Sequence, residues 1–119
     1  MNTDRVQWID LKGKKILILD FSDIKEVSVL KEVISEAEKV QNSQPDHSVL
    51  RLTKIGGVTL TEDAKRLIAE YSDSIKRYTK ASAAVGFSGV KFIIAKAINP
   101  NKKFFKTEEE ALNWLALQE

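Results

Sequence analysis

The sequence predicts an α/β domain with a mixed five-stranded sheet and four helices. Two strand-like runs at the N-terminus are followed by segments in which helical and strand-like patterns alternate. Such alternation favours a parallel sheet with helices on its faces, because right-handed crossovers are nearly obligatory. One early run, residues 16–19, is apolar throughout. The length of 119 residues, 43% hydrophobic and 30% charged, suits one globular domain, which we assign to residues 1–119.

The first two strands are expected at residues 5–11 and 15–20. The connection between them, residues 12–14, contains Gly13, and a short glycine-containing link between two such runs is typical of a hairpin. This hairpin supplies the antiparallel part of the sheet. The run 16–19 does not alternate between apolar and polar residues. Alternation disappears when neither face of a strand meets water, so we expect the second strand to be central.

The first helix is predicted over residues 27–41 from apolar residues at helical spacing, which are Leu30, Val33, Ile34, Ala37 and Val40. Before it, Asp23 and Glu26 form an Asp-x-x-Glu pattern that favours a helix start. The alternative is that Asp20 and Asp23 act as paired carboxylates near a strand end. A polar segment, residues 42–46, ends the helix, a third strand follows at residues 48–53, and Gly56 with Gly57 marks a turn.

The second helix has the clearest pattern in the sequence. Its apolar face is formed by Ala64, Leu67, Ile68, Tyr71, Ile75 and Tyr78. Thr61 is the expected N-cap. Glu62 and Asp63 follow in the first turn, where negative charge complements the positive end of the helix dipole.

The C-terminal third predicts two strands and two helices. A strand of small residues is expected at 80–86, and Ser88 with Gly89 opens a third helix that Asn99 and Pro100 end. A short strand at residues 103–105 precedes the last helix. Thr107 and Glu110 have the spacing of a capping box for that helix, which we expect to run through residue 117.

The residue types present exclude several kinds of site. Cysteine is absent, which excludes disulfides, thiolate metal ligands and cysteine nucleophiles. His47 is the only histidine, so a histidine pair for a metal does not exist, and its polar turn favours a surface residue. We expect no catalytic residue, no metal and no cofactor. No apolar run approaches the ~20 residues of a membrane span, and we expect a cytoplasmic protein.

The formal net charge of +2 is too close to balance to predict nucleic-acid binding. The distribution of charge is uneven, because residues 74–106 contain eight Lys or Arg and no Asp or Glu. The ordinary explanation is that these side chains solvate helix faces and turns. The alternative is a positive surface that attracts an anion.

A candidate ligand site follows from the loop Gly86, Phe87, Ser88 and Gly89. In an α/β sheet, ligands bind beyond the carboxyl ends of the strands, where this loop is expected. Backbone N–H groups at the start of the third helix can bind an anion, with charge from Lys54 or Lys91. The convergent polar groups of such a site would be Asp20, Ser22 or Ser88. The alternative is that these glycines serve only a tight turn.

Three stretches carry a resemblance to a known family: ILILDFS at residues 16–22, AVGFSGVK at 84–91 and FKTEEEALNWL at 105–115. With the order of elements, they resemble the SpoIIAA-like small bacterial proteins, which have the STAS fold and are related to CRAL-TRIO-like domains. The resemblance implies a non-enzymatic regulatory or protein-interaction module. It also implies an alternative, a domain that binds a small molecule, an anion or a lipid at the carboxyl ends of the parallel strands.

Anti-anti-sigma factors of this fold switch partners by phosphorylation of a hydroxyl where the helix after the third strand begins. Thr61 stands near that position here. Glu62 and Asp63 beside it would repel a phosphate, so the regulatory role is disfavoured and the N-cap role is favoured. The protein partner is not identified by the sequence. The last helix, with Trp114, is apolar on more than one side and is a candidate surface for self-association.

Overall fold

The computed structural model describes residues 4–86 and 103–118. In chain order it contains β1 (Val6–Leu11), β2 (Lys14–Asp20), α1 (Val27–Asn42), β3 (Val49–Lys54), α2 (Glu62–Ile75), the 3-10 helix η1 (Lys76–Tyr78), β4 (Thr79–Val85), β5 (Lys103–Phe105) and α4 (Glu108–Ala116). The described part therefore has three α-helices where four were expected for the whole chain. The remaining one, predicted to open at Ser88 and Gly89, lies outside the described residues.

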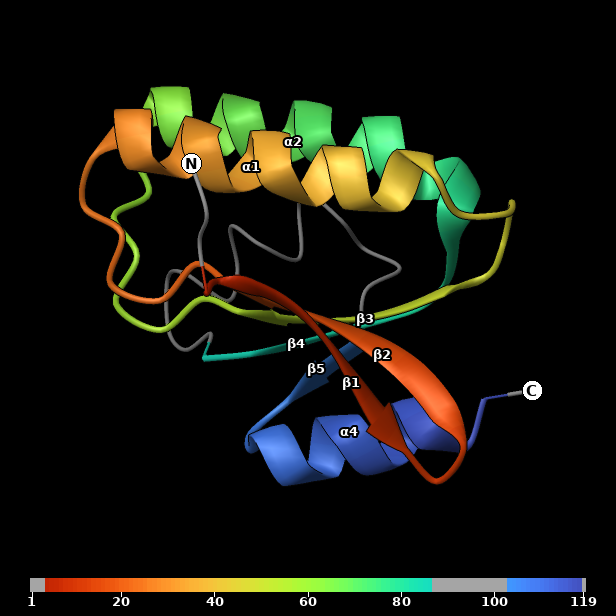
Figure 1. Ribbon diagram of the computed structural model, residues 1–119. Helices are drawn as coiled ribbons and strands as arrows, with labels where there is room; N and C mark the ends of the chain where they lie inside the picture. The colour runs from red at the N-terminus through yellow and green to blue at the C-terminus, as the bar shows by residue number, and fades with distance from the viewer. Residues whose placement is uncertain (1–3, 87–102, 119) are drawn as a thin grey trace.

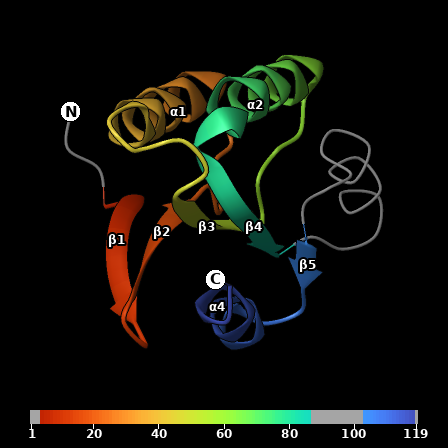
Figure 2. The ribbon, with the colours of Figure 1, turned by 90° about the vertical axis from the view of Figure 1, so that its right-hand side faces the viewer.

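The five strands form one mixed sheet in the order β1-β2-β3-β4-β5. β1 and β2 are antiparallel, and every other neighbouring pair is parallel. This confirms the predicted mixed sheet and its N-terminal hairpin. Figure 1 shows α1 and α2 side by side over one face of the sheet, and Figure 2 shows α4 beneath the opposite face.

The hairpin turn is one residue shorter than expected. β1 ends at Leu11 and β2 begins at Lys14, so only Lys12 and Gly13 connect them. Both have positive φ, 53° and 80°. This is the combination that a two-residue type I′ turn requires, and its twist matches that of the strands.

Strand β2 is covered on both faces, as its apolar run predicted. Leu17 and Leu19 pack in the cluster beneath α1 and α2, while Ile16 packs in the cluster around α4, and all three are fully buried. In the sheet order β2 has a neighbouring strand on each side. Burial on both faces explains why its sequence does not alternate.

Helix starts are set by different means in the three helices. The Thr61 hydroxyl accepts a hydrogen bond from the Ala64 N–H at 3.1 Å, and the Thr107 hydroxyl accepts one from the Glu110 N–H at 3.1 Å, so both predicted caps are confirmed. The expected capping role of Asp23 is wrong. The N-cap of α1 is Glu26, and its side chain makes no cap hydrogen bond.

Asp23 instead holds a loop. It has φ 60°, and its N–H donates to the Gly56 carbonyl at 2.8 Å. A Cβ built on Gly57 would lie 2.1 Å from the Asp23 Oδ1, so the carboxylate occupies the space that the glycine leaves. The β2–α1 and β3–α2 loops are thereby joined. The Asp23 side chain therefore packs against the distant Gly57 and does not cap the nearby helix.

Candidate functional site

The described members of the predicted ligand site lie at one edge of the sheet. Asp20 ends β2, Lys54 ends β3 and is its register partner, and Gly86 follows β4. Ser22 lies two residues beyond Asp20. The sequence therefore placed these four residues correctly at the carboxyl edge. Phe87, Ser88, Gly89 and Lys91 lie outside the described residues.

The Asp20 carboxylate is held by its neighbours. Its Oδ1 accepts a hydrogen bond from the Ser22 N–H at 2.9 Å and lies 3.9 Å from the Arg5 Nη1. That guanidinium also donates to the Ser22 carbonyl at 2.8 Å. Burial alone would raise the pKa of Asp20, but hydrogen bonds from Ser22 and the positive charges of Lys54 and Arg5 outweigh it and lower the pKa. Asp20 is accordingly ionised at neutral pH.

Lys54, expected to bind an anionic ligand, forms an ion pair instead. Its Nζ lies 3.1 Å from Glu108 Oε1 in the first turn of α4. Charges of alternating sign, from Arg5 through Asp20 and Lys54 to Glu108, therefore cross this edge. Glu108 is the member that sequence reasoning missed, because it is far along the chain from Lys54 and no local pattern links the two residues.

Gly86 is required by close packing of the backbone. It has φ 93°, and a Cβ added there would lie 2.6 Å from the Gly56 nitrogen. Only glycine allows the end of β4 to approach the β3–α2 loop this closely. This contact favours the tight-turn explanation for Gly86.

The remaining predicted residues are separate from this edge. Thr61 is exposed and caps α2, and His47 is exposed in the α1–β3 loop with φ 55°. Trp114 is partly buried, and its ring centroid lies 5.6 Å from that of Phe105. Leu117, just after α4, is 71% exposed.

A buried polar cluster was not predicted. Arg51, on β3, donates from Nη1 to Gln41 Oε1 at 2.9 Å and to Thr79 Oγ1 at 2.8 Å, and from Nη2 to Ser82 Oγ at 3.2 Å. Gln41 in turn donates to the Tyr71 hydroxyl at 2.8 Å. The one available signal was an arginine in the otherwise apolar start of a strand, residues 49–52.

This cluster joins α1, α2, β3 and β4 without a carboxylate. Arg51 is 3% exposed, and burial lowers the pKa of its guanidinium. Burial also raises the pKa of Tyr71 to about 12. The Arg51 Nε and the Thr53 hydroxyl, both buried, have no hydrogen-bond partner among the residues that the structure describes. A buried cation balanced only by neutral dipoles is costly, so every partner that remains is important to stability.

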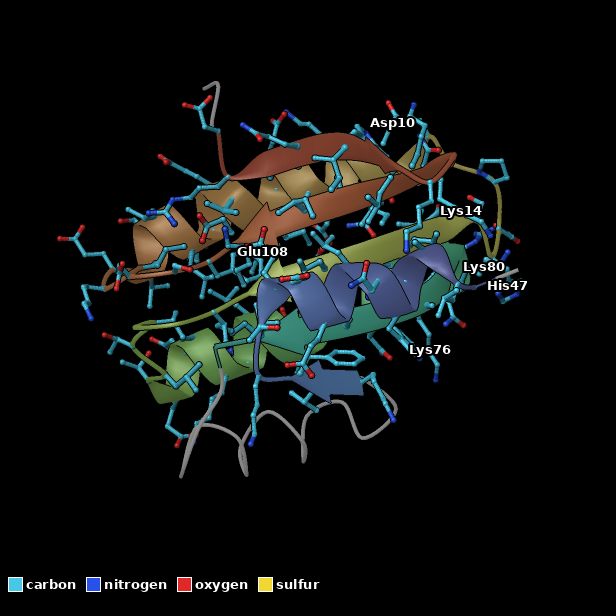
Figure 3. The ribbon with its side chains drawn as sticks, turned by 90° about the horizontal axis from the view of Figure 1, so that it is seen from below. Asp10, Lys14, His47, Lys76, Lys80 and Glu108 are labelled. Carbon is cyan, nitrogen blue, oxygen red and sulfur yellow. The ribbon has the colours of Figure 1, made fainter. Side chains whose placement is uncertain are left out.

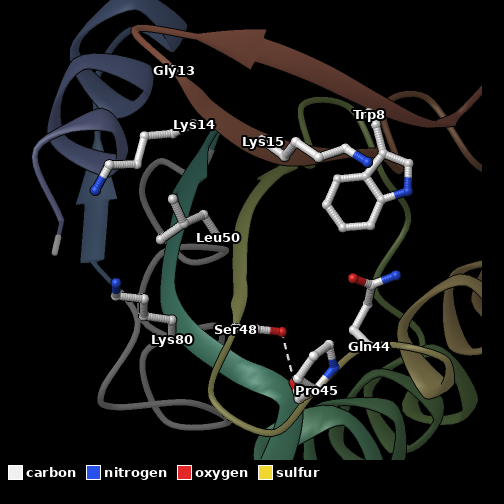
Figure 4. A pocket seen from close by; sticks show the side chains of 9 residues that line it. All are labelled: Trp8, Gly13, Lys14, Lys15, Gln44, Pro45, Ser48, Leu50 and Lys80. Carbon is white, nitrogen blue, oxygen red and sulfur yellow. Dashed lines mark hydrogen bonds between the residues drawn. The ribbon is translucent and has the colours of Figure 1, made fainter.

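A cavity of about 300 Å³ lies at the opposite edge, by the amino ends of the parallel strands. Its walls come from the hairpin, the α1–β3 loop and the start of β4. Figure 4 shows Lys14 and Lys80 on one side of it, with Lys15, Trp8 and Gln44 on the other side. Sequence reasoning did not single out this edge.

Across residues 4–86 and 103–118, no three His, Asp or Glu side chains are grouped so as to hold a metal ion. Within the same ranges, no helix has the length and apolar character needed to cross a membrane. No family model, curated protein or solved structure matches the chain.

Proposed function

We propose that the chain is a non-enzymatic interaction module of the SpoIIAA-like type, and that it docks a second copy of itself. The observation that carries this proposal is that, within residues 4–86 and 103–118, α4 is the one helix over this face of the sheet (Figure 2) and leaves apolar residues partly exposed. The docking surface, which we call the α4 face, consists of Ile9, Leu11, Ile18, Leu112, Trp114 and Leu117. All of these are apolar, and none is fully buried.

Simple dimensions explain why this face stays open. Five strands at about 4.8 Å spacing make a sheet about 19 Å wide between its outer strands. One α-helix is about 10 Å in diameter, and the nine residues of α4 extend only about 14 Å. On the other face, the longer helices α1 and α2 lie side by side (Figure 2). An exposed leucine beside a half-buried tryptophan is typical of a protein-binding surface.

Charge complementarity favours a second copy as the occupant. Glu108, Glu109 and Glu110 lie at the start of α4, whereas the hairpin lysines Lys12 and Lys14 lie beside its end, where Lys14 donates to the Gln118 carbonyl. Figure 3 shows Glu108 and Lys14 at opposite ends of this helix. A twofold axis across α4 would bring the acidic end of each copy to the basic end of the other.

Sedimentation equilibrium of the purified protein tests the proposal. We expect a dimer whose dissociation constant lies below about 100 μM. Leu117→Glu should give a monomer, because it places a charge in the apolar contact. Ser28→Glu, which adds the same charge on the exposed side of α1, should leave the dimer intact. A wild-type protein that stays monomeric at about 1 mM would contradict self-association.

Ligand binding at the carboxyl edge is the less favoured function. Its two charged members already have partners, since Asp20 is bound by Ser22 and Arg5, and Lys54 by Glu108. An incoming anion would have to displace Glu108 from Lys54. NMR titration with millimolar phosphate tests this alternative. Shifts of the Gly86 and Lys54 backbone amides would support ligand binding at the carboxyl edge.

A further inference from the structure

The cavity at the amino edge has an unusual lining. Its polar and aromatic wall is formed by Trp8, Lys14, Lys15, Gln44, Ser48 and Lys80, and it contains no acidic residue. The side chains come from three segments far apart in sequence. They meet here only because the sheet brings the hairpin, the start of β3 and the start of β4 together (Figure 4).

Among residues 4–86 and 103–118, no carboxylate forms an ion pair with the three lysines of this cavity. Five ion pairs within 4 Å join the described residues, and none includes Lys14, Lys15 or Lys80. Lys14 donates to a backbone carbonyl, and the Lys15 Nζ lies 5.2 Å from the centre of the Trp8 ring. Asp10 is the cross-strand neighbour of Lys15 on the hairpin, so the positive potential around the hollow is strongest near Lys14 and Lys80, and an anion would be attracted there.

A β-bulge positions the third lysine. Val49 pairs with Thr79 and Leu50 pairs with Ala81, so Lys80 has no residue opposite it in the ladder. The extra residue in a bulge is turned out of the regular pleat, and bulges commonly re-aim a side chain at a site. Figure 4 shows the side chains of Lys80 and Lys14 extending to the same side of the cavity.

We propose that this cavity binds a small phosphate monoester with a flat apolar group. The doubly charged phosphate would lie between Lys14 and Lys80, because lysine binds phosphate as a point charge. The flat group would contact Trp8 and Pro45 on the opposite wall. The Ser48 hydroxyl donates its proton to the Pro45 carbonyl at 2.6 Å, so the phosphate would be held by the lysines and not by this hydroxyl.

The surroundings favour a small ligand over a long polyanion. A volume of about 300 Å³ is at the lower end of the range for small-molecule sites. Asp10 lies on the hairpin opposite Lys15, whereas Asp46, in the α1–β3 loop, is paired with Arg77 at 3.2 Å. A nucleic acid or an anionic membrane passing over the cavity would meet the Asp10 carboxylate, which disfavours a long polyanion.

NMR titration with adenosine monophosphate, inorganic phosphate and adenosine tests the site. We expect adenosine monophosphate to shift the Trp8 indole N–H and the backbone amides of Gly13, Lys15 and Lys80. Phosphate alone should shift the lysine side of the cavity more weakly, and adenosine should bind far less tightly than its monophosphate. Shifts confined to other parts of the chain, or none at millimolar ligand, would overturn the proposal.

Variants that each remove one positive charge distinguish binding in this cavity from a general attraction of anions to the protein surface. Lys14→Gln and Lys80→Gln should each weaken binding of the monophosphate about fivefold or more. Lys31→Gln removes the same charge from an exposed position towards the other end of α1 and should leave the affinity unchanged. Equal weakening by all three variants would reject a specific cavity. So would binding to phosphatidylglycerol vesicles with no response to the monophosphate.

The outcome is independent of the proposed dimer. Leu117→Glu lies outside the cavity lining and should bind the monophosphate as the wild type does. Loss of the dimer with retained phosphate binding would contradict neither proposal. Loss of phosphate binding in Leu117→Glu would mean that the cavity is complete only in an assembly, which contradicts the site as formed by one chain.

Discussion

At the scale of single residues, the most consequential side chain is Arg51. It is buried under α1 and α2 with no carboxylate among its hydrogen-bond partners. Neutral groups therefore replace the water that would otherwise solvate its guanidinium group. Gln41 is the central partner because it accepts from Arg51 and donates to Tyr71. Removing it would leave a buried guanidinium group and a buried hydroxyl each short of a hydrogen bond.

Gln41→Leu should therefore lower the free energy of unfolding by about 2 kcal/mol. The measurement is urea denaturation followed by circular dichroism. Asn42→Leu, at the exposed last residue of the same helix, is the control and should change the free energy of unfolding by less than about 0.5 kcal/mol. Equal effects of the two substitutions would mean that the cluster contributes nothing specific.

Tyr71 gives the cluster a pH dependence in the alkaline range. Burial raises its pKa to about 12 in the folded protein, against 10.0 for an ordinary tyrosine. Its contribution to stability is complete below pH 10 and is lost as the pH rises towards 12, because the unfolded chain releases this proton first. Between pH 9.5 and pH 11.5, the urea midpoint of the wild type should fall more steeply than that of Tyr71→Phe. Parallel slopes would contradict the assignment.

At the scale of elements, the sequence predicted those features that depend on residues close together in the chain, such as turns and helix caps. Both threonine caps and the strand Lys103–Phe105 were found where they were expected, and the hairpin was found with a turn one residue shorter. The second helix ends earlier than its apolar spacing indicates, because residues 76–78 tighten into a 3-10 turn before β4. Contacts such as Lys54 with Glu108, or Arg51 with Gln41, join residues on different elements, and no periodicity in the sequence specifies them.

The Thr61 cap is the element-scale feature that is most directly testable. Thr61→Ala removes the acceptor for the Ala64 N–H and should lower the free energy of unfolding by about 1 kcal/mol. Thr61→Ser keeps the hydroxyl and should restore most of that loss. Thermal or urea unfolding of both variants measures it. If Thr61→Ala altered self-association while leaving stability unchanged, the residue would have a regulatory role instead of a capping role.

At the scale of the whole molecule, charge is arranged along α4. The helix begins with three glutamates near the carboxyl edge of the sheet and ends beside the lysine-rich hairpin and the start of β4 (Figure 3). The total charge of +2 hides this separation, which is why composition alone did not indicate a surface. The acid-free stretch 74–106 contributes Lys76 and Lys80 to the basic end, where Arg77 is paired with Asp46. Lys12, Lys14 and Lys15 come from a different part of the chain, and only the fold brings the two groups together.

If the acidic end of α4 in one copy meets the basic end in the other, exchanging the two charges should first break and then restore the dimer. In an antiparallel arrangement of two copies, Glu109 of one chain would face Lys12 of the other, so Glu109→Lys and Lys12→Glu should each weaken the dimer, and the double variant should recover it. Net charge alone does not predict this pattern. Glu109→Lys raises the formal charge from +2 to +4 and Lys12→Glu lowers it to 0, so general repulsion would weaken one dimer and strengthen the other. Sedimentation equilibrium at low and high salt measures both effects. Recovery in the double variant requires the two residues to meet across the interface, and its absence, with all variants folded by circular dichroism, would reject the antiparallel pairing of α4.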